Sequence, residues 1–162
     1  DVTGVQTCAL PISMMDQDKA ETAMQVNYFA FARIAQAVAR PMTRARSGRI
    51  VAIGSVIGQV ASQGNAAYAA TKGGITSMCR GLARTYGPHR ITVNCVSPGQ
   101  VHTPMLMTGL SPEVYENMKK QTPLGYVAEP SEMAGPVVFL ASDHASYITG
   151  STINASGGFL MY

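Results

Sequence analysis

The N-terminal third of the chain contains a long apolar segment with helical spacing. Asp16 is placed to cap a helix over residues 19–40, and Pro41 is predicted to end it. Within residues 22–39 the only charged side chain is Arg33, although a surface helix normally keeps one polar face. We therefore expect this helix to be covered on two faces, by a sheet and by a second partner.

A second helix, predicted over residues 65–86, is rich in alanine and glycine in its first half. Small residues let another backbone approach closely, and Gly87-Pro88 is typical of a helix end. Residues 49–54 form a short run without polar alternation, which is typical of a strand covered on both faces, and residues 90–96 predict a second strand of the buried type. A last short strand is predicted over residues 151–154. Two further helices are predicted, over residues 112–119 and 130–141.

This alternation of strands and helices predicts an α/β fold with a parallel sheet. The chain has 162 residues, of which 46% are hydrophobic and 13% charged, so it is one domain's worth of sequence and too apolar to be disordered. No apolar run reaches the roughly 18 residues that span a bilayer, and no secretory signal is recognisable. We expect a soluble, cytoplasmic protein. Cys8, Cys79 and Cys95 have no paired spacing, which favours reduced thiols over disulfides or a metal site.

Charge is distributed unevenly along the chain. The net charge is +3, and no carboxylate occurs between Glu21 and Glu113, whereas nine lysines and arginines fall in that interval. Such a stretch attracts a phosphorylated or acidic partner. It has few aromatic side chains to stack on bases and no known DNA-reading motif, so nucleic-acid binding is disfavoured.

Residues 1–13, DVTGVQTCALPIS, follow neither a helical nor a strand period. The segment is similar, residue for residue, to the translation of a common sequencing adapter, and on that interpretation it is excluded from the fold. The alternative interpretation is an ordinary N-terminal strand and turn. We expect the folded domain to comprise residues 14–162.

Tyr68 and Lys72 lie four residues apart on the second predicted helix, so their side chains share one face, with Cβ atoms about 5–6 Å apart. A tyrosine that acts near neutral pH must lower its pKa from about 10 to about 7, at a cost of roughly 4 kcal/mol. An ammonium about 4 Å away attracts the phenolate by a similar amount at an effective dielectric constant of about 20. Lys72 is therefore suited to tune Tyr68 as an acid or base, although solvated pairs show the same spacing.

Two more polar residues, Ser55 and Asn27, lie at positions that suggest a function. Ser55 ends the strand predicted over residues 49–54, where open α/β sheets bind their ligands, thirteen residues before Tyr68. Asn27 lies inside an apolar helical stretch, where an unpaired amide is costly. Taken singly, Ser55 is also compatible with a strand-end turn and Asn27 with a structural amide. Together with Tyr68 and Lys72 they indicate a catalytic group.

The chain resembles the short-chain dehydrogenase/reductase family over residues 14–162. The matching segments are QVNYFAF with Asn27, AIGSVIG with Ser55, YAATK from Tyr68 to Lys72, NCVSPGQVHTPM, PLGYVAEPSEMAGPVVFLASD and YITGSTINASGG. Within the family the sequence is most similar to 3-oxoacyl-(acyl carrier protein) reductases. The resemblance implies the C-terminal part of a Rossmann-like, doubly wound parallel sheet whose first strands and helices are missing.

The resemblance also implies an NAD(P)-dependent oxidoreductase of fatty acid biosynthesis, with NADP or NAD as cofactor. Tyr68 is then the general acid in carbonyl reduction, Ser55 holds the substrate oxygen, Lys72 lowers the tyrosine pKa and binds the nicotinamide ribose, and Asn27 fixes a water in the proton relay. Four residues are implied to line the nicotinamide: Pro98, Gly99, Val101 and Thr103. The implied substrate is a small-molecule carbonyl, with a 3-oxoacyl thioester as the expected case, and no metal is needed.

The same resemblance implies a homodimer or homotetramer built on the two long helices, with neither nucleic acid nor membrane as partner. Arg46 and Arg90 lie in loops that face the acyl carrier protein in these reductases, although solvated loop charge is the alternative interpretation. The glycine-rich turn that cradles the cofactor pyrophosphate is absent, and with it the residue that selects NAD or NADP. The alternative function is therefore a catalytically inactive piece that retains only helix-mediated dimerisation.

Overall fold

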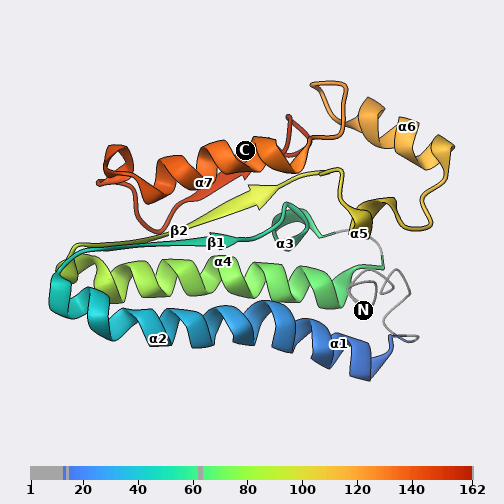
Figure 1. Cartoon of the computed structure of the whole chain (residues 1–162). Helices are drawn as coiled ribbons and strands as arrows, with labels where there is room; N and C mark the ends of the chain where they lie inside the picture. Colours follow the sequence, from blue (N-terminus) through green and yellow to red (C-terminus); the bar gives the residue numbers. More distant parts are fainter. Residues whose placement is uncertain (1–12, 14, 62–63, 162) are drawn as a thin grey trace.

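The structure, a computed structural model, describes residues 13, 15–61 and 64–161. Its sheet has three parallel strands in the order β1-β2-β3, with α2 and α4 on one face and α7 on the other (Figure 1). The strands are β1 (Gly48–Ile53), β2 (Ile91–Pro98) and β3 (Thr152–Ala155). The predicted α/β fold with a parallel sheet is confirmed.

The helices connect and cover these strands. In chain order they are α1 (Gln17–Ala23), the π-helix η3 (Met24–Phe29), α2 (Ala30–Ala45), α3 (Ile57–Val60), α4 (Ala66–Tyr86), α5 (Pro104–Met107), α6 (Pro112–Gln121) and α7 (Ala134–Ala141). Short 3-10 turns are η4 (Gly87–His89), η5 (Pro130–Met133) and η6 (Asp143–Ala145). The short helices α3 and α5 were not predicted, because four residues are too few to show a helical period.

The first predicted helix is longer and less regular than expected. Asp16 caps it as predicted, since its carboxylate accepts a hydrogen bond from the Lys19 amide at 3.2 Å. The prediction that Pro41 ends the helix is wrong, because α2 continues to Ala45. Proline removes one N–H donor, and the carbonyl freed four residues earlier, at Ala37, belongs to an exposed residue that water can satisfy.

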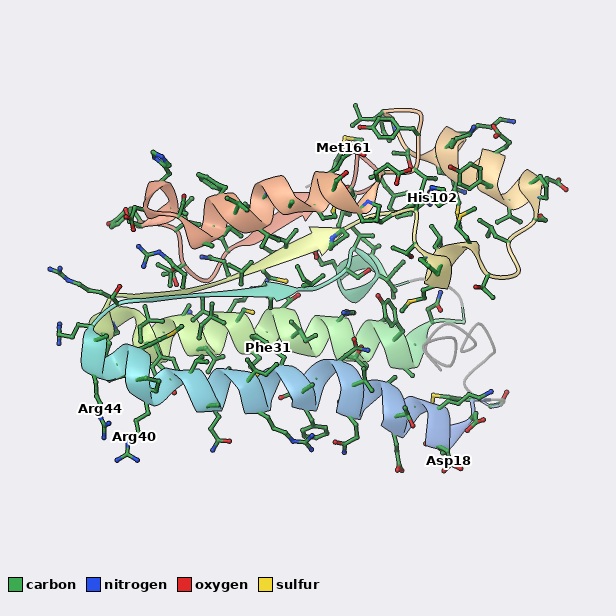
Figure 2. All side chains as sticks on the ribbon, viewed as in Figure 1. Asp18, Phe31, Arg40, Arg44, His102 and Met161 are labelled. Carbon is green, nitrogen blue, oxygen red and sulfur yellow. The ribbon has the colours of Figure 1, made fainter. Side chains whose placement is uncertain are left out.

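The core consists of two apolar layers, one on each face of the sheet. Between the sheet and helices α4 and α2, the strands contribute Ile50, Ala52, Ile91, Val93 and Cys95, which cluster with Ile75, Cys79 and Ala83 of α4 and with Phe31 of α2 (Figure 2). On the other face, Val96 of β2 clusters with Leu140 of α7 and Ala145 of η6, with Val51, Val137, Ile148 and Ile153 at the margin. Both faces of β2 are thereby buried, so the polar Thr92 and Asn94, which alternate with Ile91, Val93 and Cys95, also lie inside the protein.

The second covered face expected for the first helix is open in this chain. Val26, Phe29 and Ile34 are 60%, 41% and 62% exposed, although all three are large apolar residues. Exposed large apolar side chains gathered on one helical segment are typical of an interaction site. The partner that would cover it remains a prediction.

The structure also bears on the expectations for the cysteines, for a metal site and for membrane-spanning segments. Cys79 and Cys95 are buried free thiols, whereas Cys8 and the adapter-like segment, apart from Ser13, lie outside the described residues. Within the described ranges, no group of three or more histidine, cysteine, aspartate or glutamate side chains is arranged to hold a metal ion. The helices of that part of the chain are also too short or too polar to cross a membrane.

Candidate active site

The hydroxyl groups predicted to act together meet at the carboxyl end of β1. Ser55 follows this strand and forms a side-chain hydrogen bond with Tyr68 of α4. One helical turn along, the Lys72 Nζ lies 5.8 Å from the centre of the Tyr68 ring and donates a hydrogen bond to the Ile53 carbonyl at 3.1 Å. Strand β1 and helix α4 thus bring all three predicted side chains into one cluster.

Ser55 is held in place by backbone pairing that continues beyond the strand. The Gly54 amide donates to the Val96 carbonyl at 2.8 Å, and the Val56 amide donates to the Pro98 carbonyl at 3.0 Å. The Ser55 Oγ in turn accepts a hydrogen bond from the amide that begins α3, at 3.2 Å. Because its neighbours on both sides are tied to β2, the buried Ser55 cannot move without disturbing the sheet.

The ionisation of Tyr68 differs from the sequence-based expectation. Burial raises the pKa of Tyr68 above its ordinary value of 10.0, and the hydrogen bond from Ser55 opposes this effect only in part. The lowering expected from Lys72 does not appear in this arrangement, because the ammonium is directed to the Ile53 carbonyl and not to the phenol oxygen. Tyr68 is accordingly a protonated phenol near neutral pH.

Lys72 is itself perturbed by its surroundings. Burial lowers its pKa from 10.5, while the nearby Cys95 sulfur acts in the opposite direction. Cys95 lies directly beneath the site, since a Cβ atom on Gly54 would be 2.7 Å from its Sγ. From the sequence Cys95 is expected to be an inert core thiol, and no local motif distinguishes it from one.

Asn27 lies in the π-helical turn between α1 and α2. Its Nδ2 is buried and has no hydrogen-bond partner among the described residues. The turn packs against α4 where Gly74 leaves room for the Tyr28 ring, 3.0 Å from the position a Cβ would take. π-Helical turns occur frequently at functional sites. A free buried donor is suited to bind a water.

The end of β2 and the segment after it carry the four residues implied to line the nicotinamide. Gly99 is needed for close packing, because a Cβ there would lie 2.8 Å from the Ser156 Cα. Val101 forms an isolated parallel bridge with Ala128, and the Thr103 hydroxyl caps α5 by accepting the Leu106 amide at 3.3 Å. Pro98 ends β2. These contacts fix the backbone of the segment beside Ser55.

Two glutamines near the site were not predicted. The Gln59 side chain donates from α3 to the buried Ser97 hydroxyl at 2.9 Å, which ties the turn after Ser55 to the end of β2. Gln100 Oε1 is buried without a partner in the described part of the chain. Glutamine is common on protein surfaces, so only the fold reveals these positions.

The described residues fit one half of a nicotinamide dinucleotide. Lys72 offers an ammonium to ribose hydroxyls, and the unpaired Gln100 Oε1 offers an acceptor to an amide N–H. For the pyrophosphate, the described residues contain no glycine-rich turn of the required spacing.

Comparison with known proteins places this geometry in a family. A family model described as enoyl-(acyl carrier protein) reductase matches residues 3–160. The 3-oxoacyl-[acyl-carrier-protein] reductase of Salmonella typhimurium is 40% identical over 147 residues, which cover 91% of this chain and 60% of that protein. The chain belongs to the short-chain dehydrogenase/reductase family.

Other family members give the same picture. The 3-oxoacyl-[acyl-carrier-protein] reductase of Pseudomonas aeruginosa is 43% identical over 148 residues, covering 91% of this chain and 59% of the relative. The crystal structure of the reductase of that name from Brucella melitensis superposes with a TM-score of 0.88 at 34% identity and covers 93% of this chain and 56% of that one. The chain therefore spans about 60% of the length of the curated relatives it matches.

The structure does not bring every implied residue to the site. Arg46 and Arg90 are exposed and lie at the amino-terminal ends of β1 and β2, whereas Ser55 follows the carboxyl end of β1. Within one chain these two arginines therefore do not flank the Ser55 and Tyr68 hydroxyls. Arg46 donates to the Pro88 carbonyl at 3.3 Å, which joins the two loops that carry them.

Proposed function

We propose that this chain carries the proton-transfer site of an NAD(P)-dependent oxidoreductase that interconverts a carbonyl and a secondary alcohol. The observation that carries the proposal is the cluster of three side chains: the Ser55 hydroxyl lowers the pKa of Tyr68, and the Lys72 ammonium lies 5.8 Å from the phenol ring. A protonated phenol next to a second hydroxyl is the arrangement that a general acid for a carbonyl oxygen requires. Family membership supports the same chemistry.

In this proposal Ser55, Tyr68 and Lys72 have different roles in the reaction. The reduced cofactor, when bound, supplies a hydride to the carbonyl carbon. Ser55 donates a hydrogen bond to the substrate oxygen, and Tyr68 transfers its phenol proton to that oxygen as negative charge develops. Because burial raises the pKa of Tyr68, the phenol stays protonated until negative charge develops on the substrate oxygen. Lys72, 5.8 Å from the ring, stabilises the phenolate that remains once its ammonium turns from the Ile53 carbonyl toward the phenol oxygen.

Asn27 completes the relay in this proposal. After each turnover the phenolate must recover a proton from solvent, and a water held by the unpaired Asn27 Nδ2 is suited to begin that path. Pro98, Gly99, Val101 and Thr103 border the nicotinamide from the segment after β2, whose backbone is fixed by the contacts described above. The cofactor is NADP or NAD.

The substrate class in this proposal is a 3-oxoacyl thioester carried by acyl carrier protein. Its support is the agreement of two curated relatives and one solved structure on that name. Met105, Met107 and Met118 lie on the two helices that follow the nicotinamide segment, where flexible apolar side chains suit an acyl chain. The pathway that uses such a reduction is fatty acid biosynthesis.

Turnover by the chain itself tests the proposal. Purified chain is titrated with NADPH and with NADH, and oxidation of the reduced cofactor is followed with an acetoacetyl thioester as substrate. Tyr68→Phe should lower kcat by at least about 100-fold, the usual contribution of a positioned acid. Tyr147→Phe is the matched control, because Tyr147 is fully exposed and distant in the fold. Unchanged turnover in Tyr68→Phe, or wild-type chain that binds neither cofactor, would contradict the proposal for this chain.

A second candidate function, assembly through the long helices, is favoured by the exposed apolar residues Val26, Phe29 and Ile34. A dimer that buries this surface would provide the second covered face expected from the sequence. Ile34→Glu should shift the chain toward monomer in analytical ultracentrifugation, whereas Gln36→Glu, on an exposed residue of the same helix, should not. A wild-type chain that sediments as a monomer at all concentrations would exclude this function.

A further inference from the structure

A pocket opens at the amino-terminal end of the sheet, away from Ser55. It has a volume of about 780 Å³, and the residues that matter in its lining are Arg46, Arg49, Arg90, Thr92, Tyr147 and Thr149. Among the described residues that line it, three are arginines and none is a carboxylate. Arg40 and Arg44 add positive charge at the same end of the molecule (Figure 2). The potential in this pocket favours an anion.

The floor of the pocket is formed by two residues that face each other in the sheet. Arg49 of β1 and Thr92 of β2 are register partners, so their side chains lie next to each other on the face covered by α7. Thr92 is only 6% exposed, and its Oγ1 has no hydrogen-bond partner in the described ranges. The Arg49 Nε is likewise buried and unpaired there.

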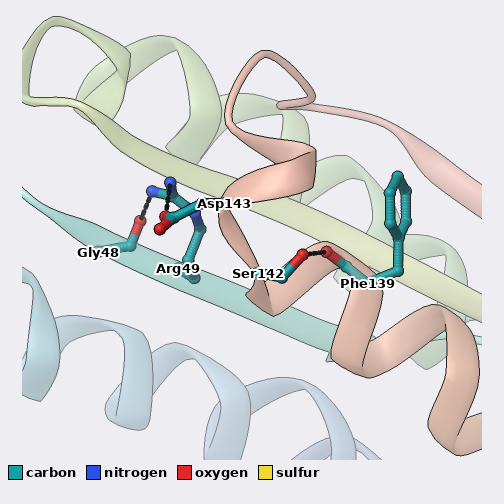
Figure 3. Close-up of polar contacts among 5 residues, drawn as sticks. All are labelled: Gly48, Arg49, Phe139, Ser142 and Asp143. Atoms are coloured by element: carbon teal, nitrogen blue, oxygen red, sulfur yellow. Dashed lines mark hydrogen bonds and ion pairs between the residues drawn. The ribbon is translucent and has the colours of Figure 1, made fainter.

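The two terminal nitrogens of Arg49, Nη1 and Nη2, already have oxygen partners within the protein. Its Nη1 donates to the Gly48 carbonyl at 3.0 Å, and its Nη2 contacts the Asp143 carboxylate at 3.3 Å (Figure 3). Asp143 is fully exposed, and an exposed ion pair contributes little. The Arg49 side chain is 20% exposed, so its guanidinium can exchange this carboxylate for another oxyanion that enters the pocket.

Two buried donors without acceptors are unfavourable in a folded protein, and such groups normally have a ligand or water as partner. Once the Arg49 side chain turns its Nε toward the pocket, an oxyanion with several oxygens accepts the Nε–H and an Nη–H together, because the guanidinium fork matches that geometry. The same anion can accept the Thr92 hydroxyl after rotation of the side chain. Arg46 and Arg90 supply further charge from the two loops that border the pocket.

We propose that this pocket binds a tetrahedral oxyanion of the phosphate class, either as the free ion or as the phosphate group of a small metabolite. Arg49 and Thr92 hold the anion at the floor, and Arg46 and Arg90 hold it at the rim. The site lies at the opposite end of the sheet from Ser55 and does not depend on the oxidoreductase proposal. Binding can therefore be tested without turnover.

The test is calorimetric titration of the full chain with inorganic phosphate. Wild-type chain should bind saturably, and Arg49→Gln should weaken binding by at least about tenfold, because it removes the charge and the paired donors. Thr92→Val should weaken it by a few-fold. Arg44→Gln is the matched control: it removes one charge from the same end of the molecule without touching the pocket, and it should change the affinity by less than about twofold.

The source of the phosphate is distinguished in a parallel titration with glycerol 3-phosphate. Equal affinity for the two probes indicates the free ion, and tighter binding of the ester indicates a metabolite; both results support the site. Thr92→Val is expected to fold at least as stably as wild type without phosphate, because it removes an unpaired buried hydroxyl. Absence of saturable binding to both probes, or equal losses in Arg44→Gln and Arg49→Gln, would overturn the proposal.

Discussion

Gly58 of α3 and Gly73 of α4 touch backbone to backbone. A Cβ atom on Gly58 would lie 2.6 Å from the Gly73 amide nitrogen and 2.7 Å from the Lys72 carbonyl carbon. Helix α3 immediately follows Ser55, and α4 carries Tyr68 and Lys72. This contact therefore sets how close the serine comes to the other two side chains, and neither helix can give way without moving the site.

Gly58→Ala should destabilise the chain by about 1–3 kcal/mol, as expected when a methyl group is forced against backbone atoms. Denaturant unfolding measures the change in free energy. Gly81→Ala provides the control on α4, because nothing lies within 4 Å of a Cβ at that position. That variant should be more stable by about 0.5–1 kcal/mol, the difference between alanine and glycine within a helix. Equal stability of the two variants would show that the α3–α4 contact is not tight.

Asn94 is the polar link between β2 and the loop before β3. Its Nδ2 donates to the Ile148 carbonyl at 2.8 Å and its Oδ1 accepts the Ser151 amide at 3.1 Å, although the residue is fully buried. Asn94→Ala leaves both backbone groups unpaired and should cost about 2–4 kcal/mol in thermal or denaturant unfolding. Asn117→Ala, on the exposed side of α6, should change stability by less than about 0.5 kcal/mol.

The hydrogen bond between Ser55 and Tyr68 predicts an ionisation that NMR can measure. The pKa of Tyr68 lies above 10.0 because the phenol is buried, and the Ser55 hydroxyl lowers it by stabilising the phenolate. Ser55→Ala should therefore raise the pKa of Tyr68 further, as followed by the chemical shift of its ring carbon that bears oxygen. Since the pKa is higher in the folded state, this residue's contribution to stability is complete below pH 10.0 and is lost as the pH rises above it.

A Tyr68 pKa that falls, or that stays constant in the variant, would show that the two hydroxyls are not hydrogen-bonded in solution.

The sequence predicted the regular elements well, because long helices and buried strands leave strong patterns. Helix α4 and strand β1 lie within about one residue of their expected bounds. Pro41 misled the prediction because a proline signals a helix end only where its lost hydrogen bond cannot be replaced by water. The π-helical turn at Asn27 left no periodic signal, since one extra residue in a turn is invisible within an apolar run.

In the candidate site, too, the identity of the residues could be predicted from the sequence but their detailed interactions could not. Four residues were predicted from motif spacing, and the structure brings Ser55, Tyr68 and Lys72 together. Electrostatic detail was not predictable, because the direction of the Lys72 ammonium depends on the Ile53 carbonyl, which no sequence pattern specifies. For the same reason the pocket at Arg49 and Thr92 could not be foreseen: the two residues are 43 positions apart and meet only through strand register.

Lys72 should reduce the stability of the fold. Burial lowers its pKa from 10.5, so the charged form is less favourable in the folded chain than in the unfolded chain. Lys72→Met keeps the length of the side chain and removes the buried charge, and it should make the chain more stable near neutral pH while weakening cofactor binding. Denaturant unfolding at about pH 7 compares the two chains, with Lys120→Met on an exposed residue of α6 as the control.

The pH dependence of stability distinguishes removal of the buried charge in Lys72→Met from better apolar packing by the methionine. A lowered pKa in the folded state gives a stability contribution that is present above pH 10.5 and is lost as the pH falls through the folded value. The advantage of Lys72→Met over wild type should therefore grow from about pH 11 down to about pH 7. An advantage that is independent of pH would mean that the methionine gains from packing alone. A variant less stable than wild type at neutral pH would mean that the hydrogen bond to the Ile53 carbonyl outweighs the cost of burying the ammonium.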